Sequence, residues 1–181
     1  MEKIDNKIIS SEAARAALAF GAISGGYIFV SGALGKLDSL VISNIVSIVL
    51  WLAKFIGCIA LMKYLMKKLQ GSFEGVTRGS LISYGTMIAL FSAIITAACS
   101  YISVQYVFPD QMSQAFDMVF QQYSSMLDSN SMAALEQMEG KMGVMSLTGN
   151  FIWCFLYGWI LSTILAGSLA GKKDIFDDDD I

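Results

Sequence analysis

Long stretches without a charged residue divide the chain into membrane-spanning segments. Three runs contain no Asp, Glu, Lys or Arg, namely 16–35, 79–109 and 142–171, and a fourth, 39–62, is interrupted only by Lys54. A helix needs about 20 such residues to cross the hydrocarbon core, and none of the runs alternates polar and apolar residues as a barrel strand does. The pattern predicts an all-α polytopic membrane protein with four transmembrane helices at about 16–35, 40–62, 79–108 and 144–170.

The basic residues gather in the segments that would lie on one side of the membrane. Nine of the twelve fall before the first span, between the second and third, and after the fourth: Lys3, Lys7, Arg15, Lys63, Lys67, Lys68, Arg78, Lys172 and Lys173. Because short loops rich in Lys and Arg stay in the cytoplasm, we expect both termini to be cytoplasmic. Residues 1–173 then form a single transmembrane domain, and 174–181 form a solvated acidic tail.

The longest stretch between spans, residues 109–141, is rich in methionine and acidic residues and is expected on the external side. Pro109 and Asp110 are typical of the first turn of a helix, and a second short helix is expected from Ser131. Apolar positions recur at the spacing of one face of an amphipathic helix: Met112, Phe116, Val119, Phe120 and Tyr123. This apolar face is interpreted either as a lid on the bundle or the bilayer surface, or as a docking face for a partner, since methionine adapts to varied surfaces.

Lys54 is the one charged residue inside a predicted span. A charge near the middle of a helix in hydrocarbon costs about 3 kcal/mol, and no span supplies a carboxylate to pair with it. We weigh two interpretations: a residue that binds an anion or moves a proton, and a side chain that extends toward the headgroups from a tilted helix. The first would place hydroxyl groups of the third and fourth spans around Lys54. The sequence offers Tyr84, Thr86, Ser92, Thr96, Ser162 and Thr163.

Small residues recur four positions apart in three spans, which allows helices to approach closely in lipid. The candidates for such contacts are Gly21 and Gly25 in the first span, Ala89 and Ala93 in the third, and Gly158 and Ser162 in the fourth. We interpret them as packing positions within the bundle, the alternative being a dimer face. The three cysteines lie in three different spans and are interpreted as small apolar residues rather than a copper site or a disulfide: Cys58, Cys99 and Cys154.

Composition narrows the classes of function. Hydrophobic residues make up 55% of the 181 residues and charged residues 15%, which is too apolar for an ordinary soluble domain. The net charge of −3 gives no basic surface for nucleic acid. The chain has no histidine, which excludes catalytic triads and metal sites built on imidazole. We therefore predict no catalytic residue, no cofactor and no metal.

The link before the third span carries a likeness to a known family. Residues 71–85 read GSFEGVTRGSLISYG and are followed by a long apolar run, Tyr106, the pair Pro109-Asp110 and a helix containing Phe116. In these features the chain resembles the bacterial integral membrane proteins grouped as the domain of unknown function numbered 4199, from residue 16 to about 173. The resemblance implies a small four-helix inner-membrane protein with a long loop between spans three and four. It implies no binding or catalytic residue, because that family has no established activity.

These observations favour a non-enzymatic accessory or interaction subunit whose external apolar face contacts a partner or the lipid. Its partners would be the lipid bilayer and either a membrane protein or a second copy of the chain, and no nucleic acid. The alternative is a small oligomeric transporter or channel in which Lys54 lines the path. A membrane enzyme acting on lipid would have only Glu74, Arg78 and Tyr84 as polar groups near one membrane face.

Overall fold

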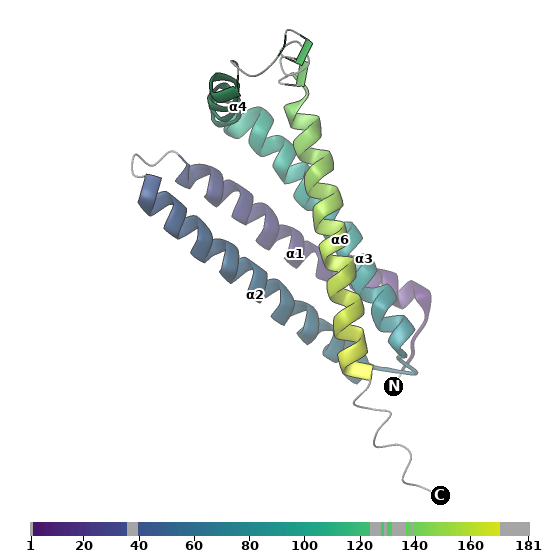
Figure 1. Ribbon diagram of the computed structural model, residues 1–181. Helices are drawn as coiled ribbons and strands as arrows, with labels where there is room; N and C mark the ends of the chain where they lie inside the picture. Colours follow the sequence, from purple (N-terminus) through teal and green to yellow (C-terminus); the bar gives the residue numbers. More distant parts are fainter. Residues whose placement is uncertain are drawn as a thin grey trace, which may run out of the picture.

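The computed structural model describes residues 2–35, 40–123, 128, 130–131, 137–138 and 140–170. Within these ranges, four helices are long and apolar enough to cross a membrane, as Figure 1 shows. They are α1 (Asn6–Leu34), α2 (Leu40–Ser72), α3 (Arg78–Ile102), which continues as the π-helix η1 (Ser103–Val107), and α6 (Met142–Ala170). The predicted all-α class with four transmembrane helices is therefore confirmed.

Two of the helices are longer than the uncharged runs that predicted them. Helix α1 begins at Asn6, where the side chain of Asp5 accepts a hydrogen bond from the Lys7 N–H, and α2 continues to Ser72. The extra turns carry charged residues, including the ion pair between Glu12 and Arg15 at 3.1 Å. An uncharged run therefore measures the part of a helix that fits the hydrocarbon core, and not the length of the helix itself.

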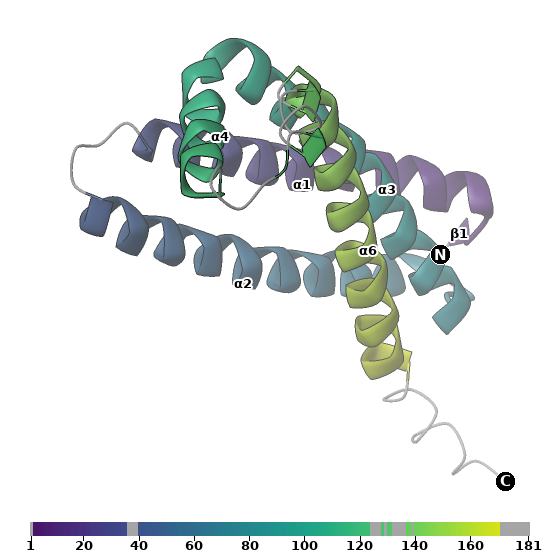
Figure 2. The ribbon, with the colours of Figure 1, turned by 45° about the horizontal axis from the view of Figure 1, so that its top comes forward.

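Helix α3 is the centre of the bundle. Most contacts between helices are those of α3 with α6 and of α3 with α1, whereas α2 touches α1 and makes few contacts with α3 and α6. Three alanines on α3 are almost fully buried: Ala89, Ala93 and Ala97. Their small side chains allow the close approach of neighbouring helices. Figure 2 shows α2 running alongside α1, and α6 crossing α2 near the C-terminal end of α2.

The buried side chains concentrate at the end of the bundle that holds the N-terminus. The core includes Ile9, Met66, Leu81 and Leu169, which come from the first turns of α1 and α3 and the last turns of α2 and α6. By contrast, the first half of α2 contributes no residue to this core among those described, and its Ile45, Ile48 and Val49 are exposed. Helix α2 is therefore packed against the bundle at one end and is loosely packed at the other.

The N-terminus is tied to the link after α2 by a short strand pair that the sequence analysis did not anticipate. Strand β1 (Glu2–Lys3) pairs in parallel with β2 (Phe73–Glu74), and the Ile4 N–H donates to the Glu74 carbonyl at 3.1 Å. Gly75 then turns the chain with a φ of +74°, a conformation that favours glycine. Thr77 caps α3 by accepting a hydrogen bond from the Ser80 N–H at 3.2 Å.

At the opposite end, proline stops the third helix and begins another. The Phe108 N–H donates to the Ser103 carbonyl at 2.8 Å, closing η1, and the ring of Pro109 prevents the same helix from continuing. The predicted helix after this proline is present as α4 (Pro109–Tyr123), while its position outside the membrane stays a prediction. Phe120 is partly buried, but the side chains of Met112, Phe116 and Tyr123 lie outside the described residues.

The remaining terminal and linking segments are described only in part. The Ser131 N–H donates to Asp128 Oδ1 at 2.9 Å, as at the start of a helix, and residues 130–131 and 137–138 are helical. Hydrogen bonds from the side chain and then the backbone of Ser131 hold the pKa of Asp128 below its ordinary value. The predicted acidic tail, 174–181, lies outside the described residues.

Candidate functional site

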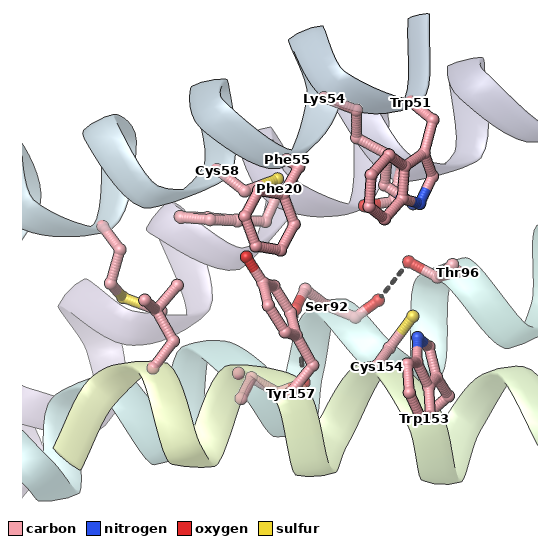
Figure 3. Close-up of a pocket in the computed structure, with 15 residues that line it drawn as sticks. Phe20, Trp51, Lys54, Phe55, Cys58, Ser92, Thr96, Trp153, Cys154 and Tyr157 are labelled. Carbon is pink, nitrogen blue, oxygen red and sulfur yellow. Dashed lines mark hydrogen bonds between the residues drawn. The ribbon is translucent and has the colours of Figure 1, made fainter. Parts of the chain in front are cut away.

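Lys54 faces a cleft between α2 and the other three long helices, which Figure 3 shows. The cleft has a volume of about 130 Å³. Its walls are mainly aromatic, apolar and hydroxyl side chains: Phe20 and Ser24 from α1; Trp51, Phe55, Cys58 and Met62 from α2; Ala89, Ser92 and Thr96 from α3; and Trp153, Cys154, Tyr157, Gly158 and Leu161 from α6. The cleft lies where the packed second half of α2 gives way to its loosely packed first half.

The Lys54 side chain is half-buried, and its ammonium group lies over an aromatic ring. The Nζ atom is 4.7 Å from the centroid of the Tyr27 ring on α1, within the range of a cation–π interaction. No Asp or Glu is among the described residues that line the cleft. The cation is thus partly stabilised by an aromatic face, but the cleft gives it no carboxylate.

Two of the six hydroxyl residues considered as neighbours of Lys54 line the cleft, and the hydroxyl groups of both donate to backbone carbonyls of α3. Ser92 Oγ donates to the Ala89 carbonyl at 3.2 Å, and Thr96 Oγ1 donates to the Ser92 carbonyl at 2.8 Å. Their oxygens remain as acceptors. Tyr84 lines a different cavity of about 340 Å³ between the ends of α1 and α2, together with Arg15 and Lys68.

The two candidate hydroxyl residues of α6, Ser162 and Thr163, make hydrogen bonds within their own helix. Both Ser162 Oγ and Thr163 Oγ1 donate to the Trp159 carbonyl, at 2.8 and 3.0 Å. Ser162 is fully buried, and neither residue, nor Thr86, is among those lining the cleft.

Aromatic side chains connect α2 to α6 across the cleft. Trp51 stacks on Phe55 with ring centroids 5.5 Å apart, and Phe55 contacts Tyr157 at 5.4 Å. The Tyr157 hydroxyl is buried and has no hydrogen-bond partner in the described part of the protein. Figure 3 shows Tyr157 extending from α6 toward α2, with the indole nitrogens of Trp51 and Trp153 turned into the space between the helices.

The structure separates the three cysteines into two environments. Cys58 and Cys154 line the cleft from α2 and α6, while Cys99 packs against α1, where a Cβ atom on Gly25 would lie 2.7 Å from its Sγ. All three are free thiols. No group of three or more His, Cys, Asp or Glu side chains among the described residues is arranged to hold a metal ion.

The small residues singled out in the sequence lie at contacts between helices of the same chain. A Cβ atom on Gly21 would lie 2.7 Å from Ile95 Cγ2, and one on Gly158 would lie 2.5 Å from Ala89 Cβ. Ser162 packs against Gly85, where an added Cβ would lie 2.3 Å from the Ser162 Cβ. These faces of α1 and α6 are therefore already covered by α3.

One polar cluster between α3 and α6 was missed in the sequence. The Ser100 and Ser146 hydroxyl oxygens are 2.7 Å apart, and Asn150 Nδ2 donates to Ser100 Oγ at 2.9 Å and to the Ser146 carbonyl at 3.0 Å. An amide within an uncharged run is the signal that could have pointed to it, because a polar group in hydrocarbon seeks a partner on a neighbouring helix.

Comparison with known proteins identifies the family and does not supply a function. Neither a curated protein nor a solved structure matches the chain. The family model described as "Protein of unknown function (DUF4199)" matches residues 16–169, a range that contains the cleft and most or all of each of the four transmembrane helices. The chain is a multi-pass membrane protein and belongs to this family of unknown function.

Proposed function

We propose that the protein is a non-enzymatic accessory subunit of the bacterial cytoplasmic membrane that binds another membrane protein through α4. The observation that carries this proposal is the packing of α4: among the described residues its main contacts are with η1, the segment directly before it. Both ribbon views support this, since α4 lies across the end of the bundle away from the N-terminus (Figures 1 and 2).

An amphipathic helix with little contact to its own bundle needs another surface for its apolar face. The bilayer surface and a partner protein both provide one. Methionine-rich faces are adaptable binding surfaces, and the predicted apolar face of α4 includes Met112. Both termini are placed in the cytoplasm in this proposal, which puts α4 on the external side.

Photocrosslinking from α4 tests the proposal. A photoreactive amino acid placed at Phe116, on the predicted apolar face, should give one discrete protein adduct in intact cells. The same residue at Gln114, which lies on the opposite side of the helix by its spacing, serves as the matched control and should give none. The adduct should also disappear when Phe120 is changed to Glu. Equal adducts from both positions, or adducts with lipid alone, would reject a protein-docking role for this face.

The second candidate, a small oligomeric transporter or channel, is favoured by the placement of Lys54 in a cleft that also contains Ser92 and Thr96. A cysteine at position 54, in a background lacking the three native cysteines, should react with a membrane-impermeant thiol reagent if water reaches the cleft. Gln122 changed to cysteine provides the exposed control. A strictly monomeric protein with an unreactive position 54 would exclude this candidate, because one chain supplies too few helices to enclose a pathway.

A further inference from the structure

We infer that the cleft at Lys54 binds the carboxylate end of a long-chain fatty acid, with the Lys54 ammonium as its counter-ion and the acyl chain leaving the bundle between α2 and α6. This site lies in the membrane-spanning part of the chain and is independent of the partner binding proposed for α4. Four features support it: the unused polar groups, the charge, the volume and the opening of the cleft.

Besides the acceptor oxygens of Ser92 and Thr96, the cleft contains hydrogen-bond donors that meet no acceptor among the described residues. They are the Lys54 ammonium, the two indole N–H groups of Trp51 and Trp153, and the buried Tyr157 hydroxyl that has no partner among the described residues. The hydroxyl protons of Ser92 and Thr96 are already given to backbone carbonyls. A ligand that completes these hydrogen bonds must therefore bring acceptors, and a carboxylate brings two acceptor oxygens without a donor.

The charge of the ligand follows from Lys54. Its Cα is nine residues before Lys63 and therefore about 13 Å along the helix from that basic end, so its ammonium lies deep in the span. A lone cation there is costly, whereas a hydrogen-bonded ion pair leaves no uncompensated charge. A fatty acid bound as its carboxylate forms this pair with the Lys54 ammonium by association alone, and no covalent bond is made or broken.

The volume and the opening of the cleft fit the head of such a ligand and not the whole molecule. A cavity of about 150 Å³ holds a molecule the size of benzene, so the 130 Å³ cleft accommodates a carboxylate and its first few carbons. The rest of the chain must continue outside. Trp51 and Trp153, on the two sides of the cleft, are 51% and 75% exposed, and the few contacts between α2 and α6 leave the space beside them to an acyl chain.

The binding test uses the full-length protein in phosphatidylcholine nanodiscs with a photoreactive palmitate that carries its diazirine near the carboxyl group. We expect labelled peptides from α2 and α6, competition by palmitate, and at least tenfold weaker competition by hexadecanol, which has the same chain without the anion. Lys54→Met should reduce labelling at least tenfold. Lys63→Met, which removes an exposed lysine from the same helix, should leave labelling unchanged.

Other outcomes reject the proposal on distinct grounds. Equal labelling of the Lys54→Met protein, or equal competition by hexadecanol, would show that the anion is not recognised. Stronger competition by phosphatidic acid than by palmitate would assign the site to a phosphate headgroup instead. If Lys54→Met fails to fold, the competition series on the unaltered protein still decides. As a second readout, palmitate should slow the reaction of Cys154 with an apolar maleimide while leaving that of Cys99 unchanged, and equal rates with and without palmitate would count against the site.

Discussion

Gly158 of α6 lies directly against Ala89 of α3, so closely that a Cβ atom at position 158 would be 2.5 Å from the Ala89 Cβ and 3.3 Å from its Cα. The contact lies at the edge of the cleft, since both residues line it. The width of the cleft and the packing of the two helices are therefore set by the same pair of residues.

A methyl group at position 158 is expected to destabilise the bundle. Overpacking costs about 1–3 kcal/mol, which outweighs the gain of about 1 kcal/mol that alanine brings to a helix. Gly158→Ala should therefore lower the midpoint of thermal unfolding in detergent. Gly149→Ala is the matched control on the same helix, because a Cβ there meets nothing within 4 Å, and it should leave the midpoint unchanged or raise it. Equal effects of the two substitutions would mean that α3 and α6 do not approach as described.

Removing the amide of Asn150 is expected to weaken the contact between α3 and α6. Hydrogen bonds between helices in membranes contribute about 0.6 kcal/mol each on average. Asn150 makes one such bond, to Ser100 of α3, while its bond to the Ser146 carbonyl lies within α6. Asn150→Ala should lower the free energy of unfolding by about 0.6 kcal/mol in a steric-trapping measurement. Thr148→Ala should have a smaller effect, because Thr148 Oγ1 donates only to the Val144 carbonyl of its own helix.

The turn at Gly75 is expected to tolerate no side chain without a loss of stability. With a φ of +74°, alanine at this position carries a strain of about 1–2 kcal/mol, and the turn positions β2 for pairing with β1. Gly75→Ala should accelerate hydrogen exchange of the Ile4 amide, which donates to Glu74. Gly71→Ala, in the last turn of α2 where a Cβ meets nothing within 4 Å, should not. Unchanged exchange of the Ile4 amide in both variants would mean that the pairing of β1 with β2 does not depend on the turn at Gly75.

Asp128 is expected to titrate below the ordinary pKa of an aspartate, 3.8, because Ser131 donates to its charged form. Since the folded pKa is lowered, the carboxylate stabilises this helix start above pH 3.8, and the stabilisation is lost as the pH falls through the folded pKa. The carboxyl carbon chemical shift of Asp128 should show this titration by NMR. In Ser131→Ala the side-chain donor is lost, so the midpoint should move upward toward 3.8; an unchanged midpoint would contradict the assigned cause.

The transmembrane helices were predictable because a long enough run of uncharged, apolar residues is sufficient to identify one. The runs 16–35 and 39–62 identified α1 and α2. Glu12 and Lys67 lie on the same helices outside these runs, and nothing in their sequence context indicated that the helices continue. The pairing of β1 with β2 was not predictable, since two residues on each side carry no pattern of alternation.

The candidate site was predictable within one helix and not between helices. Trp51, Lys54, Phe55 and Cys58 recur at three- and four-residue spacing and therefore share a face of α2. Which hydroxyl groups lie opposite this face depends on how α3 is rotated about its axis. Contacts such as that of Gly25 with Cys99 determine this rotation. No spacing within a single helix encodes that rotation, and six hydroxyl residues therefore remained candidates where the structure selects Ser92 and Thr96.

The pairing of β1 with β2 closes a loop of chain that contains the first two helices. Helices α1 and α2 are joined at one end by the chain between Leu34 and Leu40 and at the other by the pairing of β1 with β2. During synthesis β1 can pair with β2 only after Glu74 has followed the second helix. Residues 2–3 are therefore unpaired while the two helices are inserted. Once the strands have paired, the C-terminal end of α2 is tied to the start of α1, so movement of α2 away from α6 is freest toward its loosely packed first half, which extends to the region of Lys54.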